Sequence, residues 1–184
     1  PCEAGTFGST GRLSACQACS VGRFQNETGQ QDCIDCAKGS FQGGQGMSEC
    51  LECQVGYFAD LPALSVCSAC GSGTYQPNNG SVSCLQCDPG TYQALTGARS
   101  CDSCDFGTAT KEVGQAACQA CLPGTFANRT GLTSCYDCDV GTAQPGNGAS
   151  FCYPCQVGEH EDIPGQSSCS LCERGKIAAF NGTV

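Results

Sequence analysis

Cysteine is the residue of this chain whose number and regular spacing point to covalent or metal-binding chemistry. There are 21 cysteines in 184 residues, and eleven follow one another every 17 residues without insertion or deletion. From Cys19 onward, each of these eleven is the second member of a C-x-x-C pair. Thiols at this spacing either form disulfides or bind a structural metal such as zinc. The unbroken register indicates an array of similar units, each stacked on the next.

The composition favours disulfides over a large hydrophobic core. The chain has no tryptophan, one methionine, 7% aromatic residues and 26 glycines, which leaves little apolar bulk for one core. Cysteine at more than a tenth of the residues indicates an oxidising compartment, because cytosolic reductants would keep so many thiols reduced. Sequons of the N-x-S/T type also favour secretion, and we expect N-linked glycans on Asn26, Asn79, Asn128 and Asn181.

The acidic net charge of the chain limits its expected partners, and the position of its ends within the repeat indicates how far the array extends. The chain has 17 Asp and Glu against 8 scattered Lys and Arg, so nucleic-acid binding is not expected. It has no run of about 18 apolar residues, and we expect membrane attachment only through parts outside this segment. Since the sequence opens and closes in mid-repeat, we expect a single continuous array of ten to eleven repeats over residues 1–184 that is a fragment of a longer chain at both ends.

Three further positions recur when the unit is aligned on the second cysteine of its pair. A glycine follows three residues later in all eleven copies, which suggests a positive φ or a close approach between neighbours. Two residues beyond it, seven copies have Phe or Tyr, which we interpret as covering the disulfide of its own unit, with ligand stacking as the alternative. The other copies have Ala109, Ala143, His160 and Ile177. A second glycine indicates a turn and is replaced only at Arg12 and Ala63.

The secondary structure expected from this pattern is short strands and turns. No window has the sustained spacing of apolar residues that a helix requires, and glycine recurs too often for a stable helix. Each unit is predicted to be a small hairpin that runs out through the aromatic position and back into the next cysteine pair. The predicted fold class is therefore small, disulfide-rich and mainly β, an elongated tandem array of 17-residue β-hairpin repeats.

Three regular disulfide connectivities fit the spacing. The first joins the second cysteine of one pair to the first of the next, the second closes each C-x-x-C on itself, and the third makes overlapping loops such as Cys16 to Cys36. Closing a 15-residue loop is worth roughly 3 kcal/mol against about 2 kcal/mol for a four-residue loop, which favours the first and leaves the others open. Its pairs are Cys2 with Cys16, Cys19 with Cys33, Cys36 with Cys50, Cys53 with Cys67, Cys70 with Cys84, Cys87 with Cys101, Cys104 with Cys118, Cys121 with Cys135, Cys138 with Cys152 and Cys155 with Cys169, while Cys172 awaits a partner.

Residues 87–92 (CDPGTY) and 121–126 (CLPGTF), closed by the C-x-x-C pairs at 101–104 and 135–138, resemble the ephrin-receptor-like cysteine-rich repeats. Those repeats occur in vertebrate receptor ectodomains and in arrays on surface proteins of protists and algae, so the resemblance implies an extracellular or cell-surface protein. The unit is also similar to hairpins of epidermal-growth-factor-like and tumour necrosis factor receptor modules. In those modules the cysteine before x-x-G-x-aromatic bonds the next hairpin cysteine, which separately favours the first connectivity. The chain departs from the receptor families in its unbroken period and lacks the extra cysteines of those modules.

Other chemistry is not expected. A zinc array would use two repeats per site, and no 34-residue alternation is visible. Acidic residues beside cysteines, such as Asp32 and Asp35, could attract calcium but are interpreted as a solvated face. His160 is the only histidine, and no candidate nucleophile has a base nearby in sequence. We therefore expect no enzyme, no metal and no cofactor.

The sequence predicts a structural extracellular protein, because regularity is the property that the chain preserves throughout. We expect a rigid glycosylated rod in a filament, surface hair, stalk or matrix. Its expected partners are further copies of itself or other extracellular structural proteins. The alternative is a receptor or adhesin ectodomain that binds a protein or glycan ligand, and the units that lack the aromatic residue are then the candidate sites.

Overall fold

The computed structural model describes residues 1–8 and 15–174, and all regular structure in those residues is β. Twenty strands of two residues each form ten antiparallel hairpins, so the predicted small, disulfide-rich, mainly β tandem array is confirmed. Arg12, Ile177 and Asn181 lie outside the described residues. The hairpins are β1 (Thr6–Phe7) with β2 (Gln17–Ala18), β3 (Arg23–Phe24) with β4 (Ile34–Asp35), β5 (Ser40–Phe41) with β6 (Leu51–Glu52), β7 (Tyr57–Phe58) with β8 (Ser68–Ala69), β9 (Thr74–Tyr75) with β10 (Leu85–Gln86), β11 (Thr91–Tyr92) with β12 (Asp102–Ser103), β13 (Thr108–Ala109) with β14 (Gln119–Ala120), β15 (Thr125–Phe126) with β16 (Tyr136–Asp137), β17 (Thr142–Ala143) with β18 (Tyr153–Pro154) and β19 (Glu159–His160) with β20 (Ser170–Leu171).

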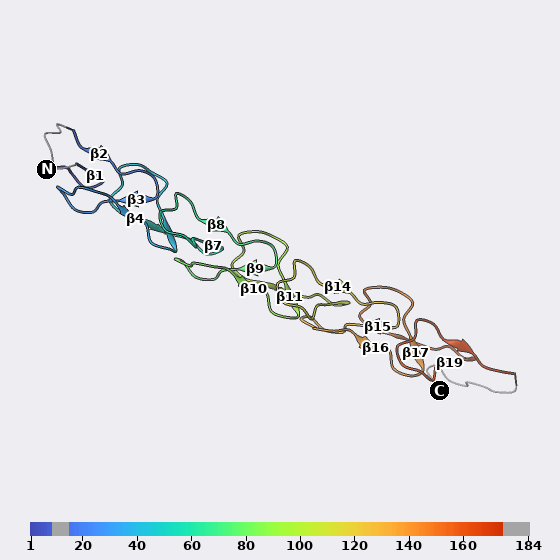
Figure 1. Cartoon of the computed structure of the whole chain (residues 1–184). Coiled ribbons are helices and arrows are strands. Elements are labelled where there is room, and N and C mark those ends of the chain that lie inside the picture. The colour runs from blue at the N-terminus through green and yellow to red at the C-terminus, as the bar shows by residue number, and fades with distance from the viewer. Residues whose placement is uncertain (9–14, 175–184) are drawn as a thin grey trace. The chain divides into compact units, whose positions relative to one another are not determined.

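The chain divides into two compact units. The first comprises residues 1–86 and 95–100, and the second comprises residues 87–94 and 101–184. Within each unit the hairpins follow one another in chain order, as the colour gradient of Figure 1 shows. We name each repeat by its first cysteine, so that the Cys104 repeat is the one that begins at Cys104.

Each hairpin is preceded by a turn that explains the glycine three residues after the cysteine. In the Cys19 repeat, the amide of Arg23 donates to the carbonyl of Ser20 at 3.1 Å, and Gly22 has a φ of 80°. This is the geometry of a type II turn, whose third residue needs a positive φ. The strands then pair so that Phe24 lies opposite Ile34. The turn therefore fixes where each strand begins and which residues face each other.

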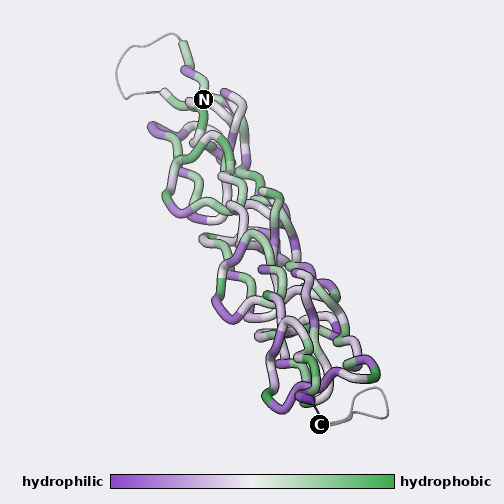
Figure 2. The backbone as a smooth tube through the Cα atoms, turned by 90° about the vertical axis from the view of Figure 1, so that its right-hand side faces the viewer, coloured by the Kyte–Doolittle hydropathy of each residue, from purple (hydrophilic) through white to green (hydrophobic). Residues whose placement is uncertain are grey.

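Half-cystines occupy the interior where a globular protein has a hydrophobic core. The largest fully buried side chains of the described residues are all cysteines, each 0–1% exposed, and they are the first cysteines of the repeats from Cys19 to Cys155. Figure 2 shows hydrophobic and hydrophilic residues interspersed along the loops of each unit, without a single apolar layer. The disulfides therefore provide the buried surface as well as the covalent closure of each repeat.

Ten disulfides close the ten described hairpins. Each joins cysteines 14 positions apart with Cα atoms 5.5–5.8 Å from each other, within the ordinary range for a disulfide. The pairs run from Cys2 with Cys16 to Cys155 with Cys169 and are those of the first connectivity. Cys172 is a free thiol of intermediate exposure.

Candidate functional site

Backbone hydrogen bonds join each repeat to the next. In both units, two amides of one repeat donate to carbonyls of the next repeat, and the turn amide of the next repeat donates back to the first cysteine. Between the Cys104 and Cys121 repeats these bonds run from Gly107 to Ala127 (2.9 Å), from Thr110 to Leu132 (3.2 Å) and from Gly131 to Cys104 (2.8 Å). Since only backbone groups take part, these bonds depend on the length of the repeat and on the conformation of its glycine turns. The junction therefore depends on register more than on side-chain identity.

The first glycine of the repeat is required both by its backbone angle and by a close approach. Gly107 has a φ of +76°, and a Cβ built on it would lie 2.0 Å from the carbonyl oxygen of Gly148. Equivalent positions in both units would bring a Cβ within 2.0–2.3 Å of the turn carbonyl 41 residues further on. The close approach is thus to the second repeat along, and not to the adjacent one. Gly158 has a φ of +88° with no described atom within 4 Å of such a Cβ, since the position 41 residues further on lies outside the 184 residues of this sequence.

The second glycine lies in a turn, as predicted, and its backbone explains its recurrence. The described glycines at this position have φ between 66° and 80°. Ala63 replaces glycine here and keeps the same conformation with a φ of 58°, and it is the one non-glycine residue with positive φ among the described residues. The amide of Ala63 still donates to the carbonyl of Cys36 at 2.8 Å. The turn is therefore preserved in the Cys53 repeat at the expense of a left-handed alanine.

A buried glutamine that was not predicted from the sequence braces the loop of several repeats. The side-chain amide of Gln42 donates to the carbonyl of Glu49 at 2.7 Å, and its oxygen accepts from the amide of Gly44 at 2.9 Å. Gln25, Gln76 and Gln144 make the same two bonds. The sequence signal is the recurrence of glutamine six residues after the cysteine in five repeats. Each side chain thus satisfies two backbone groups that the loop itself leaves unpaired.

In the Cys104 repeat, the residue at the aromatic position lies beside the disulfide of the following repeat. This residue, Ala109, clusters with Cys121 and Leu132 of the next repeat, and Cys135 packs against that cluster. Likewise Phe41 and Cys67, which belong to successive repeats, line one surface hollow. The interpretation that the aromatic residue covers the disulfide of its own unit stays a prediction, because Ala109 has no ring. The residue at this position therefore links neighbouring repeats.

The asparagines of the described sequons lie on exposed loops. Asn26, Asn79 and Asn128 are exposed and follow the first strand of their hairpins. The side-chain oxygen of Asn79 accepts a hydrogen bond from the amide of Val55 at 3.0 Å, which leaves its nitrogen free of that contact. Asn181 is outside the described residues. Glycosylation of the four asparagines remains a prediction.

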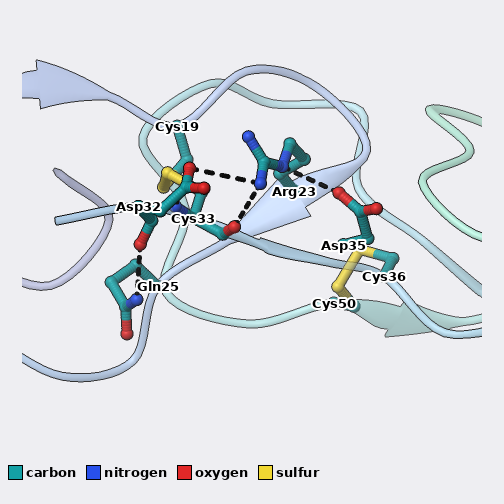
Figure 3. A network of polar contacts seen from close by, with 8 residues as sticks. All are labelled: Cys19, Arg23, Gln25, Asp32, Cys33, Asp35, Cys36 and Cys50. Atoms are coloured by element: carbon teal, nitrogen blue, oxygen red, sulfur yellow. Dashed lines mark hydrogen bonds and ion pairs between the residues drawn. A yellow bond between two sulfur atoms is a disulfide. The ribbon is translucent and has the colours of Figure 1, made fainter. Parts of the chain in front are cut away.

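Asp32 and Asp35 form ion pairs with one arginine. Figure 3 shows Arg23 between the two carboxylates, at 3.2 Å from Asp32 and 2.7 Å from Asp35. The guanidinium also donates to the carbonyl of Cys33. His160 lies 4.0 Å from Asp162. Over residues 1–8 and 15–174, no three His, Cys, Asp or Glu side chains gather as a metal ion would require.

The family follows from a comparison with known protein families. The family model described as tyrosine-protein kinase ephrin type A/B receptor-like matches residues 22–63, 56–104, 81–121 and 90–138. Together these matches extend from residue 22 to residue 138, which is more than half of the chain. The chain belongs to the ephrin-receptor-like family. No curated protein sequence matches it.

Membership of the ephrin-receptor-like family indicates that this chain is an extracellular, receptor-type, cysteine-rich module. The ten disulfides agree with that environment, since they persist only where conditions are oxidising. No helix long and apolar enough to cross a membrane occurs in the part of the chain that the structure describes.

Proposed function

We propose that this ephrin-receptor-like array is a structural, non-enzymatic segment of an extracellular protein: a stiff, glycosylated spacer of a filament, surface hair, stalk or matrix. The observation that supports this most directly is the repeated junction. The same backbone hydrogen bonds recur between successive repeats in both units, and the glycine contacts reach the repeat after next. A binding module needs only one well-formed site, whereas a spacer needs every junction to be alike.

The proposed spacer has a calculable length. If the two strands of each repeat lie across the long axis at sheet spacing, each repeat adds roughly 10 Å and ten repeats extend over about 100 Å. A thin rod of that length has a radius of gyration of about 30 Å, compared with about 16 Å for a compact domain of 184 residues. Small-angle scattering of the oxidised protein separates these values, and a radius near the compact one would refute the proposal.

Glycans are the second part of the proposal. Sugars on Asn26, Asn79, Asn128 and Asn181 would cover the loop ends and keep short strand edges from pairing with other chains. Enzymatic removal of N-linked glycans from the native protein should lower its mass, and peptide mapping should place the loss at these four sites. An unchanged mass would remove glycosylation from the proposal and leave the spacer standing.

The family membership favours a second candidate, a receptor or adhesin ectodomain that binds a protein or glycan ligand. In this case the repeats that depart from the pattern would form the site. Substituting Ala109, Ala143 or His160 should then abolish ligand binding without altering the radius of gyration. A pure spacer would respond to none of these changes.

A further inference from the structure

Two of the three described sequons have a phenylalanine at a fixed distance before the asparagine. Asn26 and Asn128 each lie seven residues after the first cysteine of their repeat. Each also lies two residues after a ring, that of Phe24 or Phe126. Asn79 lies nine residues after its cysteine and has no aromatic residue two positions before it. The chain therefore contains two sequons with a ring and one, as an internal control, without it.

The burial pattern places each phenylalanine and its asparagine on the same side of the chain. Gln25 and Ala127, the residues between them, are buried at 3% and 0% exposure. The phenylalanine before each of these residues is partly exposed, and the asparagine after it is exposed. Successive side chains of an extended segment point to opposite faces. Since the middle side chain points inward, the ring and the asparagine both face outward.

In the first unit, Phe24 and Asn26 line one hollow of about 540 Å³. Ile34, which lies opposite Phe24 across the hairpin, adds to its apolar lining. Ser40 and Glu49 of the next repeat add polar groups. An apolar surface with a few polar groups is the usual composition of a small-molecule site. The hollow therefore offers a ring for the face of a sugar and polar side chains for its hydroxyl groups.

Hollows of this kind belong to the junction between repeats and not to one repeat alone. In the second unit, equivalent residues beside Ala109 also line a hollow, and Lys111 lies there at the position of Asn26. The side chain at this position therefore reaches a junction hollow in both units. The Cys19 and Cys121 repeats differ from the other described repeats because this position is a sequon asparagine. In the Cys121 repeat, the ring of Phe126 also packs against Tyr136 with centroids 5.9 Å apart.

We propose that the phenylalanine two residues before each of these asparagines is a stacking platform for the first sugar of the attached glycan. The pairs are Phe24 with Asn26 and Phe126 with Asn128. N-linked glycans begin with N-acetylglucosamine, and one face of its pyranose ring consists of C–H groups, which pack on the electron-rich face of an aromatic ring. The occupant is this sugar because it is bonded to a residue that lines the hollow. The inference rests on the proposed glycosylation and adds that two of the glycans stabilise the junctions beside them.

Hydrogen exchange of three equivalent amides tests the stacking. The amides of Gln25, Gln76 and Ala127 each donate to a carbonyl of the next repeat, at 3.2, 3.0 and 2.9 Å. The oxidised chain, secreted by a host that adds high-mannose glycans, is compared after two treatments. An endoglycosidase leaves only the first sugar on each asparagine, whereas an amidase removes that sugar too and converts every glycosylated asparagine to aspartate. Loss of the first sugar should accelerate exchange about 2- to 12-fold at Gln25 and Ala127, as expected for one aromatic stacking contact. Exchange at Gln76 should stay unchanged, because no ring precedes Asn79.

The substitution Phe24→Leu tests the ring itself, because it keeps an apolar side chain and removes the aromatic face. In this variant, loss of the first sugar should no longer accelerate exchange at Gln25, whereas the effect at Ala127 should persist. Proton NMR gives a measurement that does not depend on stability. The C–H protons of the first sugar on Asn26 should resonate upfield of those on Asn79, because they lie over a ring, and Phe24→Leu should remove this difference.

The possible failures of this inference and of the proposed function are distinguishable. Equal acceleration at all three amides, or an effect at Gln25 that survives Phe24→Leu, would mean that the sugar acts without the ring and would overturn the stacking. Sugar protons of Asn26 and Asn79 with the same resonances would also overturn it, while glycosylation would stand. An Asn26 without a glycan would overturn both stacking and glycosylation at this site. The spacer function depends on neither result, because the radius of gyration of about 30 Å tests it separately.

Discussion

Substitution of Gly107 by alanine separates the two reasons for the first glycine of the repeat. An alanine in the left-handed conformation costs about 1–2 kcal/mol on its own. At Gly107 the new Cβ would also lie 2.0 Å from the carbonyl oxygen of Gly148, whereas an ordinary contact is at least 3.4 Å. The turn of the second repeat along must therefore retreat by about 1.4 Å, and forced packing of this kind adds roughly 1–3 kcal/mol. We expect Gly107→Ala to destabilise its repeat by about 2–5 kcal/mol in total.

Gly158→Ala is the matched control, because Gly158 occupies the same turn with a φ of +88° and no described atom near its Cβ position. It should cost only the conformational part, about 1–2 kcal/mol. The assay is hydrogen exchange of the amide that donates to the substituted residue, which is Cys121 for Gly107 and Cys172 for Gly158. Relative to the wild type, exchange should accelerate more in Gly107→Ala by roughly 5- to 150-fold. Equal acceleration in both variants would show that the close approach contributes nothing.

Three further predictions concern single features of the repeat. Ala63→Gly should stabilise the Cys53 repeat by about 1 kcal/mol, because glycine adopts the left-handed conformation without the strain that alanine has. Hydrogen exchange of the residue-63 amide should therefore slow, and faster exchange would contradict the reasoning. Gln42→Ala should cost about 1–3 kcal/mol, because it removes two hydrogen bonds to backbone groups of the loop. The exposed Gln45→Ala should stay within about 0.5 kcal/mol, and similar losses for both variants in thermal unfolding would argue against the brace. Reduction of the disulfides should abolish slow amide hydrogen exchange throughout, since the largest fully buried side chains of the described residues are cysteines. Amides that stay protected from exchange after dithiothreitol treatment would show that a core other than the disulfides holds the fold.

The hairpins and the disulfide spacing could be predicted from the sequence because both depend on contacts close along the chain. The type II turn needs glycine at its third position, so the recurrence of Gly22 and its equivalents indicated a backbone requirement. The carbonyl that approaches Gly107 comes from a residue 41 positions away. That contact depends on how three repeats stack, and spacing within one repeat does not contain that information.

The candidate sites were less accessible to sequence reasoning. Gln42 has a residue type that is ordinarily exposed, although its recurrence at a fixed distance from the cysteine is a usable signal. Ala109 was noted as a departure from the pattern together with Ala143. Only the strand register separates the two residues, because it places Tyr153 opposite Ala143 and Gln119 opposite Ala109. The absence of a ring from the β13–β14 pair therefore follows from a pairing across the hairpin that the linear sequence does not display.

The approach of the first glycine to the turn two repeats later limits how such a chain can grow. An inserted or deleted residue in one loop would displace that loop relative to the preceding hairpin and to the hairpin before it. Lengthening by a whole 17-residue unit disturbs neither, because every glycine again finds a turn carbonyl at the same offset. In-frame duplication of complete units is thus the one change of length that this architecture absorbs at no structural cost, and the smallest piece that contains the full set of contacts is three units long.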